Sequence, residues 1–114
     1  TADTLAALKE AKKRGSHTLA IVNVVGSSIA NAADDVIYTW AGPEIAVATT
    51  KGYSTQLSVL YLFAVWAARL LKTADSARLE KIFDDILMLP ELTERVILAE
   101  PQIKEMAKHC GDPK

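Results

Sequence analysis

The sequence predicts an α/β protein built on a parallel sheet, because helix-like and strand-like segments alternate along its first half. Residues 2–14 have helical periodicity, and residues 18–24 form a β-branched apolar run without polar alternation. A second short helix and a second short strand follow at residues 28–33 and 36–40. The order helix, strand, helix, strand favours parallel strands joined by crossover connections.

The first predicted helix has clear signals at both ends. Leu5 and Leu8 share one face with neighbouring alanines, and basic residues fill the last turn. Thr1 can cap the N-terminus, and Gly15 ends the helix. A helix N-terminus also presents unpaired N–H groups to anions, so the hydroxyls of Thr1 and Thr4 make this turn a candidate phosphate site.

The two predicted strands are expected to be buried on both faces, as in a parallel sheet. Two strands are too few for an independent sheet of this kind. We therefore expect a strand before residue 1 that this chain lacks, so that the chain is a fragment that folds poorly as a monomer. The segment 40–56 follows the second strand and carries hydroxyl, amide and charged side chains at the end where α/β sheets bind ligands. Apolar residues 45–48 suggest that part of its backbone is buried.

A long helix is predicted at residues 53–71. If the segment 40–56 is a plain loop and not a site, Thr50 or Ser54 would cap this helix. Its apolar run, 57–68, is shorter than the roughly 20 residues that span a bilayer, so we expect a buried core helix and no membrane association. The rest of the chain reads as helical. An apolar stripe at residues 79–87 is ended by Pro90, and two short helices at 91–98 and 102–109 are separated by Pro101.

Composition narrows the function classes. The 114 residues have a net charge of −1 and no basic cluster, which argues against nucleic acid as a partner. One cysteine, Cys110, fits a reducing cytoplasm, and no signal peptide is visible. His17 and His109 lie far apart, so no metal site is predicted. No nucleophile–base motif is present, and we assign no catalytic residue.

Four segments together resemble the glucosamine-6-phosphate synthase family, the glutamine–fructose-6-phosphate aminotransferases (isomerizing). These segments are Thr-Ala-Asp-Thr-Leu at 1–5, Ala-Ile-Val-Asn-Val-Val-Gly-Ser-Ser at 20–28, Ala-Gly-Pro-Glu-Ile-Ala-Val-Ala-Thr-Thr-Lys at 41–51, and Tyr-Ser-Thr-Gln-Leu at 53–57. The resemblance implies that residues 1–72 are the second part of the first sugar-isomerase (SIS) subdomain, which has a flavodoxin-like fold. Residues 73–114 then form a helical segment leading toward a second subdomain.

The resemblance also implies site residues and partners. Thr1 matches the last threonine of the family's phosphate loop, and Val47 matches a position whose backbone lines the sugar site. The family's catalytic glutamate, histidine and lysine belong to the second subdomain, so none is carried over. The implied ligand is fructose 6-phosphate or glucosamine 6-phosphate, with glutamine used by the parent enzyme and no cofactor. A cytoplasmic homo-oligomer is expected.

Three other interpretations stay open. The chain is similar enough to other SIS proteins to belong to a phosphosugar isomerase or deaminase, whose parent would lack a glutaminase domain. A regulatory module that senses a sugar phosphate is a second alternative, marked by an upstream helix-turn-helix. A purely structural dimerization fragment is the third, because uncovered apolar surface usually acquires a partner.

Overall fold

The computed structural model describes residues 2–45 and 47–110. It divides into two compact units, residues 1–63 and 64–114, and the division falls within one long helix. The first unit contains a parallel sheet with helices, and the second unit is helical, which confirms the predicted α/β class followed by helices. The predicted boundary at residues 72 and 73 stays a prediction.

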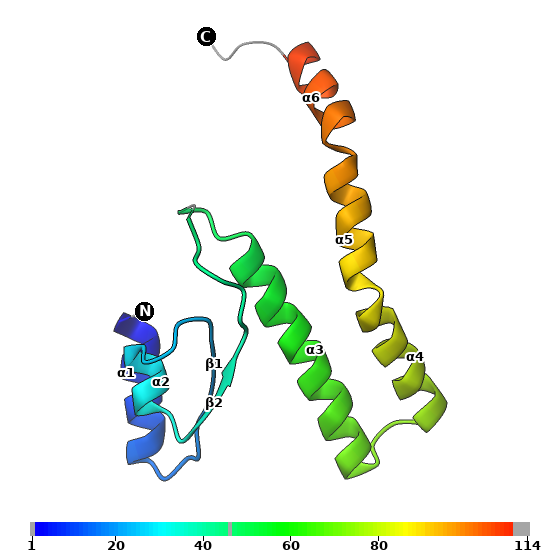
Figure 1. Cartoon of the computed structure of the whole chain (residues 1–114). Helices are drawn as coiled ribbons and strands as arrows, with labels where there is room; N and C mark the ends of the chain where they lie inside the picture. Colours follow the sequence, from blue (N-terminus) through cyan, green and yellow to red (C-terminus); the bar gives the residue numbers. More distant parts are fainter. Residues whose placement is uncertain (1, 46, 111–114) are drawn as a thin grey trace. The chain divides into compact units, whose positions relative to one another are not determined.

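The first unit begins α1 (Ala2–Lys13), β1 (Leu19–Val22), α2 (Ser28–Ala32), β2 (Asp35–Tyr38), as predicted in order and type. The two strands are parallel and pair in register from Leu19 opposite Asp35 to Val22 opposite Tyr38. Both strands are shorter than the sequence predicts. Helices α1 and α2 pack against each other beside the strand pair (Figure 1).

A single carboxylate joins these elements at the amino ends of the strands. Asp34 Oδ2 accepts hydrogen bonds from the backbone N–H and the hydroxyl of Thr18, at 2.8 and 2.7 Å. Its Oδ1 lies 2.8 Å from Lys12 Nζ, which also donates to the carbonyl of Ala32 at 2.9 Å. Lys12 and then Thr18 hold the pKa of Asp34 well below its usual range. The ends of α1 and α2 are thereby tied to the start of β1.

The long helix α3 (Lys51–Leu71) differs from its prediction. We expected a buried core helix, but none of its residues is buried. Leu60, Tyr61 and Trp66 are between 49% and 59% exposed. Its length and mean hydropathy of 1.3 also suit a membrane span, a test that core helices of water-soluble domains pass as well. Its apolar composition is that of a covered helix, although none of its residues is buried in this structure.

The second unit contains the end of α3 followed by α4 (Ser76–Leu87), α5 (Leu89–Leu98) and α6 (Glu100–His109). Asp75 caps α4 by accepting a hydrogen bond from the N–H of Arg78 at 3.1 Å. As predicted, the helix with the apolar stripe ends just before Pro90, which lies in the first turn of α5, and Pro101 lies in the first turn of α6. Proline suits this position because the first N–H groups of a helix have no intrahelical acceptor.

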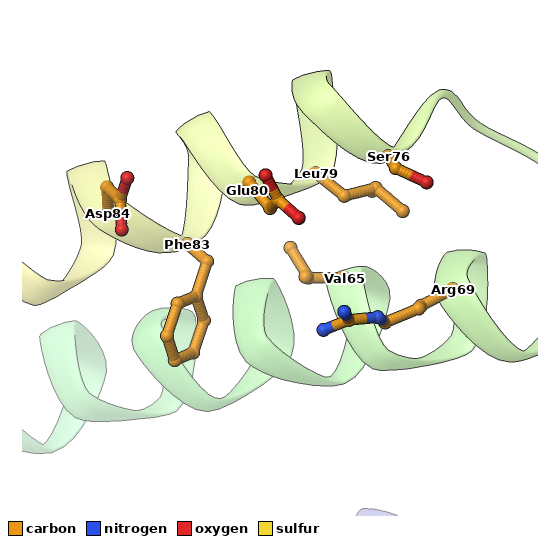
Figure 2. A pocket seen from close by; sticks show the side chains of 7 residues that line it. All are labelled: Val65, Arg69, Ser76, Leu79, Glu80, Phe83 and Asp84. Atoms are coloured by element: carbon orange, nitrogen blue, oxygen red, sulfur yellow. The ribbon is translucent and has the colours of Figure 1, made fainter.

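Very little of the described chain forms a core. Its buried apolar residues are Ala20 on β1, Ala30 on α2 and Leu79 on α4. Leu79 lies between α4 and the end of α3, close to Val65 and Phe83 (Figure 2). Because larger apolar side chains of α3, α4, α5 and α6 remain exposed, these four helices have the composition of a domain interior without its cover.

Candidate functional site

An open groove of about 770 Å³ runs along α1 and β1 in the first unit. This volume lies within the usual range for small-molecule sites, roughly 300–1,000 Å³. Its apolar floor comes from Leu8 and Ala11 of α1 and from the side chains of β1. Polar side chains are contributed by Thr4, Thr18, Asn23, Ser27 and Gln56.

Four of these polar residues mark the carboxyl end of β1. Thr4 lies in the first turn of α1, Asn23 and Ser27 follow β1, and Gln56 comes from the first half of α3. All four side chains are uncharged hydrogen-bonding groups. Parallel strands place their carboxyl ends beside the N-termini of the adjoining helices, where N–H groups and helix dipoles favour anions. The groove therefore has the chemistry of a site for a phosphorylated polar ligand.

Ser27 shows how the local sequence builds this edge. Gly26 adopts a left-handed backbone with φ of 72°, which turns the chain directly after the strand. Ser27 then caps α2, its Oγ accepting a hydrogen bond from the N–H of Ala30 at 3.3 Å. The hydroxyl proton of Ser27 remains available to a ligand in the groove. The Gly-Ser-Ser segment thus provides both the turn after β1 and the cap of α2.

Asn23 joins the carboxyl ends of the two strands. Its Oδ1 accepts hydrogen bonds from Thr39 Oγ1 at 3.1 Å and from the N–H of Ala41 at 2.9 Å. Its Nδ2 donates to the carbonyl of Gly42 at 2.7 Å. Three bonds from one half-buried amide fix the start of the segment after β2. Gly42 supports this geometry with a left-handed φ of 74°.

Glu44 holds the other end of the same segment. Its carboxylate accepts hydrogen bonds from the N–H groups of Thr50 at 3.5 Å and Gly52 at 3.1 Å, at the N-terminus of α3. The plain-loop alternative for this segment had Thr50 or Ser54 as the cap of this helix. The structure instead uses Glu44, because a carboxylate satisfies two first-turn N–H groups and complements the helix dipole. The hydroxyl of Ser54 donates backward to the carbonyl of Thr50.

The two ligand contacts that the resemblance implies are not brought into the groove within the described residues. Thr1 lies outside the described residues, and Thr4, one turn further along α1, does line the groove. The side chain of Val47 is fully exposed, with a relative exposure of 104%, and that of Ile45 is 93% exposed. Ile45, Val47 and Ala48 are exposed, so the buried backbone predicted for residues 45–48 is not found at these three residues. Both site assignments stay predictions.

A second cavity lies in the helical unit, between the end of α3 and α4 (Figure 2). It is lined by Arg69, Glu80 and Asp84 together with the apolar side chains around Leu79. Its volume of about 120 Å³ is below the range of ligand pockets. This cavity is part of the helix contact and offers no room for a sugar phosphate.

The candidate metal ligands are placed separately. His17 Nε2 lies 2.6 Å from Asp35 Oδ2 on the surface, and this carboxylate raises the pKa of the imidazole. His109 and Cys110 lie at the end of α6 and bond back to backbone carbonyls of their own helix. Within residues 2–45 and 47–110, no three His, Cys, Asp or Glu side chains gather as ligands for a metal ion would.

The anchoring roles of Asn23 and Glu44 were missed in the sequence. The sequence did contain a signal for Asn23. It is the one polar residue in the apolar run 20–25, and this run ends directly before Gly26. Glu44 had a weaker signal, since its bonding partners follow six and eight residues later without a regular spacing. Only the fold of the segment brings it to the start of α3.

Comparison with known proteins adds independent information. The chain is 51% identical over 107 residues to glutamine–fructose-6-phosphate aminotransferase (isomerizing) of Clostridium acetobutylicum, covering 94% of this chain and 18% of the relative. The proteins of the same name from Thermococcus kodakarensis and Clostridium perfringens are 49% and 48% identical over 98% and 100% of this chain, and 19% of each relative is covered. The chain thus spans about a fifth of the length of these relatives.

The SIS domain profile matches residues 1–66, which include α1, both strands, α2 and most of α3. This match contains every residue described above at the groove and in the segment after β2. It also confirms the resemblance drawn from the motifs at residues 1–57. With more than half of its length matched, this chain belongs to the SIS domain family.

Proposed function

We propose that this chain is part of the fructose-6-phosphate-binding isomerase domain of a glutamine-dependent aminotransferase that makes glucosamine 6-phosphate. The observation that carries the proposal is an identity of 40–51% over nearly the whole chain to enzymes that bear this name. The match extends through the helical segment 73–114, beyond the SIS region, so it is more particular than a shared domain. A complete enzyme of this kind converts fructose 6-phosphate and glutamine into glucosamine 6-phosphate and glutamate.

The share of this chain in that reaction is binding. The phosphate group is assigned to the N-terminus of α1, where Thr1 and Thr4 supply hydroxyl donors beside the helix N–H groups. The sugar is assigned to the groove beyond β1, with the backbone of Val47 as one wall. Acid–base chemistry at the sugar is left to residues outside this chain, and aldose–ketose interconversion needs no cofactor when such residues are present.

The uncovered apolar surfaces support a larger parent. Helix α3 has exposed large apolar residues from Tyr53 to Leu71, and its residues up to 66 lie within the SIS match. In this family context α3 is a core helix covered by further polypeptide, and the protein is a cytoplasmic homo-oligomer without membrane association. Alone, the 114 residues are expected to melt without cooperativity, and a sharp two-state melt of a monomer would contradict this.

The test is an assay of the protein translated from the complete gene. We expect glucosamine 6-phosphate to form from fructose 6-phosphate only when glutamine is supplied. Turnover of a phosphosugar in a protein without any use of glutamine would identify an isomerase or deaminase instead. Sugar-phosphate binding without turnover would favour a sensing module.

The assignment of the phosphate to the N-terminus of α1 is tested with one variant and a matched control. Thr1→Ala is expected to raise the KM for fructose 6-phosphate about tenfold, as for loss of a hydrogen bond to a charged group. Thr93→Ala removes a hydroxyl that bonds its own helix on α5, and this control is expected to leave that KM unchanged. Equal KM values in the two variants would remove Thr1 from the phosphate site.

A further inference from the structure

We propose that α5 and α6 form the contact surface for a second copy of this chain, and that the helices of the two copies pair in parallel. The inference assigns a surface to the expected homo-oligomer and does not depend on the sugar-phosphate site. It follows from the spacing of exposed apolar residues along the two helices and from the charges beside them.

One apolar stripe runs along both helices. From Leu89, alternating steps of three and four residues reach Leu92, Val96, Ala99, Ile103, Met106 and Cys110. We call these residues the α5–α6 stripe, in which the cysteine acts as a small apolar residue. Ala99 is half-buried and the others are exposed. Such steps are the heptad spacing of a helix that pairs with another helix, and the stripe spans three heptads.

The stripe continues across the junction of the two helices. Ala99 alone separates α5 from α6, and its backbone stays in the right-handed helical region, with φ of −80° and ψ of −1°. Val96 of α5 and Ile103 of α6 line one open, mostly apolar groove. Figure 1 shows α6 following α5 in nearly the same direction. Both helices therefore present one apolar face, and Pro90 and Pro101 lie outside it.

The charges beside the stripe select the parallel orientation. In a parallel pair, Arg95 of one copy faces Glu100 of the other, five residues further along, and the twofold symmetry makes this contact twice. In an antiparallel pair, residues on the same side of the stripe face each other, so no opposite charges meet. One side holds Arg95, Gln102 and His109, and the other side holds Thr93, Glu100 and Ala107.

Ion pairs within each helix extend this contact into a network. Arg95 is paired with Glu91, and Glu100 is paired with Lys104 at 2.6 Å. The parallel contact joins the two pairs into a row of alternating charge. Exposed pairs of this kind add little affinity, but they fix the register and orientation of the partner. Val96 and Ile103 agree with this arrangement, because β-branched residues at alternate stripe positions favour two parallel helices.

Cys110 provides the measurement, because two parallel copies in register place their Cys110 residues opposite each other. A disulfide forms where the Cα atoms lie about 4.4–6.8 Å apart. Complete protein labelled with heavy nitrogen is mixed with unlabelled protein, oxidised with diamide and digested. We expect a disulfide-linked pair of Cys110 peptides with one labelled and one unlabelled half. Absence of this linked pair from the wild type would overturn the proposal, as would be the case if another part of the parent protein covered the stripe.

Two substitutions in α5 form a matched pair. Val96 belongs to the stripe and Leu98 does not, and their side chains are 66% and 72% exposed, so aspartate replaces no buried residue at either position. Val96→Asp should lower the yield of the Cys110 link at least about tenfold, because it buries an unpaired carboxylate in the contact. Leu98→Asp should leave the yield unchanged. Equal yields in the two variants would overturn the proposal.

A charge exchange tests the orientation. Arg95→Glu should lower the yield of the Cys110 link about fivefold, because both symmetric contacts become repulsive. Adding Glu100→Arg to this variant should restore the yield, since the same contacts form with their charges reversed. A double variant that links no better than Arg95→Glu alone would overturn the parallel pairing. The formation of glucosamine 6-phosphate is measured separately, so failure of the proposed function would leave this test intact.

Discussion

The two ends of the β1–β2 pair are held together by different chemistry. At the amino ends, the charged pair of Asp34 and Lys12 fastens both helix ends to the strand through Thr18. At the carboxyl ends, the neutral amide of Asn23 does the equivalent work with three hydrogen bonds. Only the second end adjoins the helix N-termini, where a fixed carboxylate beside the groove would compete with an anionic ligand. Glu44 is the exception, and it is engaged by α3.

The contrast indicates that the two ends of the strand pair have different roles. The amino ends hold the helices to the sheet, and the carboxyl ends adjoin the proposed ligand site. An ionised carboxylate is a strong hydrogen-bond acceptor, and Asp34 stays ionised because its pKa is lowered by Lys12 and Thr18. The neutral amide of Asn23 forms weaker hydrogen bonds than a carboxylate does, but it adds no negative charge that would repel an anionic ligand. If this division is correct, the two ends should respond differently to mutation and to pH.

The largest expected effect comes from Asn23→Ala. It leaves the N–H of Ala41 and the carbonyl of Gly42 without their partners, at a local cost of about 2 kcal/mol. Hydrogen exchange of the complete protein, resolved by peptide, should become roughly thirtyfold faster at residues 39–42. Exchange at Thr18 should not change. Equal acceleration at both ends would show that the strand pair opens as one unit, and the comparison would then fail.

Acid should loosen the amino ends first. The pKa of Asp34 is lower in the folded protein than its ordinary value of 3.8. Its stabilising contribution is therefore complete above that value and is lost as the pH falls below it toward the lower folded pKa. Between pH 5 and pH 3, protection of the Thr18 N–H should decline by roughly a few-fold, since the site is exposed.

The control for this acid effect is Asp34→Asn, in which the decline should disappear while Ala41 behaves as in the wild type. The stabilising contribution of the pair of His17 and Asp35 depends on pH in the opposite direction. Because the pKa of His17 is raised above 6.5, its contribution is complete below pH 6.5 and is lost as the pH rises through the folded value. A loss of Thr18 protection in Asp34→Asn equal to that in the wild type would assign the acid effect to another group.

A smaller effect is expected at Trp40. Its left-handed backbone is strained by about 1–2 kcal/mol, and its ring contacts Tyr38 with centroids 5.8 Å apart. Trp40→Asn should relieve most of the strain, while the lost aromatic contact offsets about 0.5–1.5 kcal/mol. The net result is a change of under about 1 kcal/mol. Trp40→Ala loses the same contact but keeps the strain, so it should be less stable than Trp40→Asn by exchange at residues 39–42. Equal stability would show that the backbone stores no strain here.

The smallest effect is expected from Gly52→Ala. A methyl group at Gly52 would lie 3.0 Å from Thr49 Cγ2 and 3.2 Å from Glu44 Oε2, both at the ends of side chains that can move. Alanine also favours a helix by up to about 1 kcal/mol. We expect the two terms to cancel within about 0.5 kcal/mol, with the KM for fructose 6-phosphate unchanged. A larger loss of stability would mean that Glu44 tolerates no displacement at all.

Much of the first unit is determined by the sequence alone. The alternation of helix and strand, the turns at Gly15 and Gly26 and the cap at Ser27 are local signals, and each is confirmed within a few residues. The family is also readable in the sequence, because its motifs are short, contiguous strings. These features need only neighbouring residues, so a linear pattern is sufficient to predict them.

The tertiary structure decided which side chains meet across the chain. The contacts of Asn23 with Gly42, Asp34 with Lys12 and Glu44 with Gly52 join positions between 8 and 22 residues apart, a separation that follows no helical or strand period. The exposure of α3 could likewise not be predicted from the sequence. An apolar helix has the same sequence pattern whether the residues that cover it belong to the same chain or not. Burial and long-range hydrogen bonds depend on what lies opposite a residue in space, and sequence periodicity reports only which face a residue occupies.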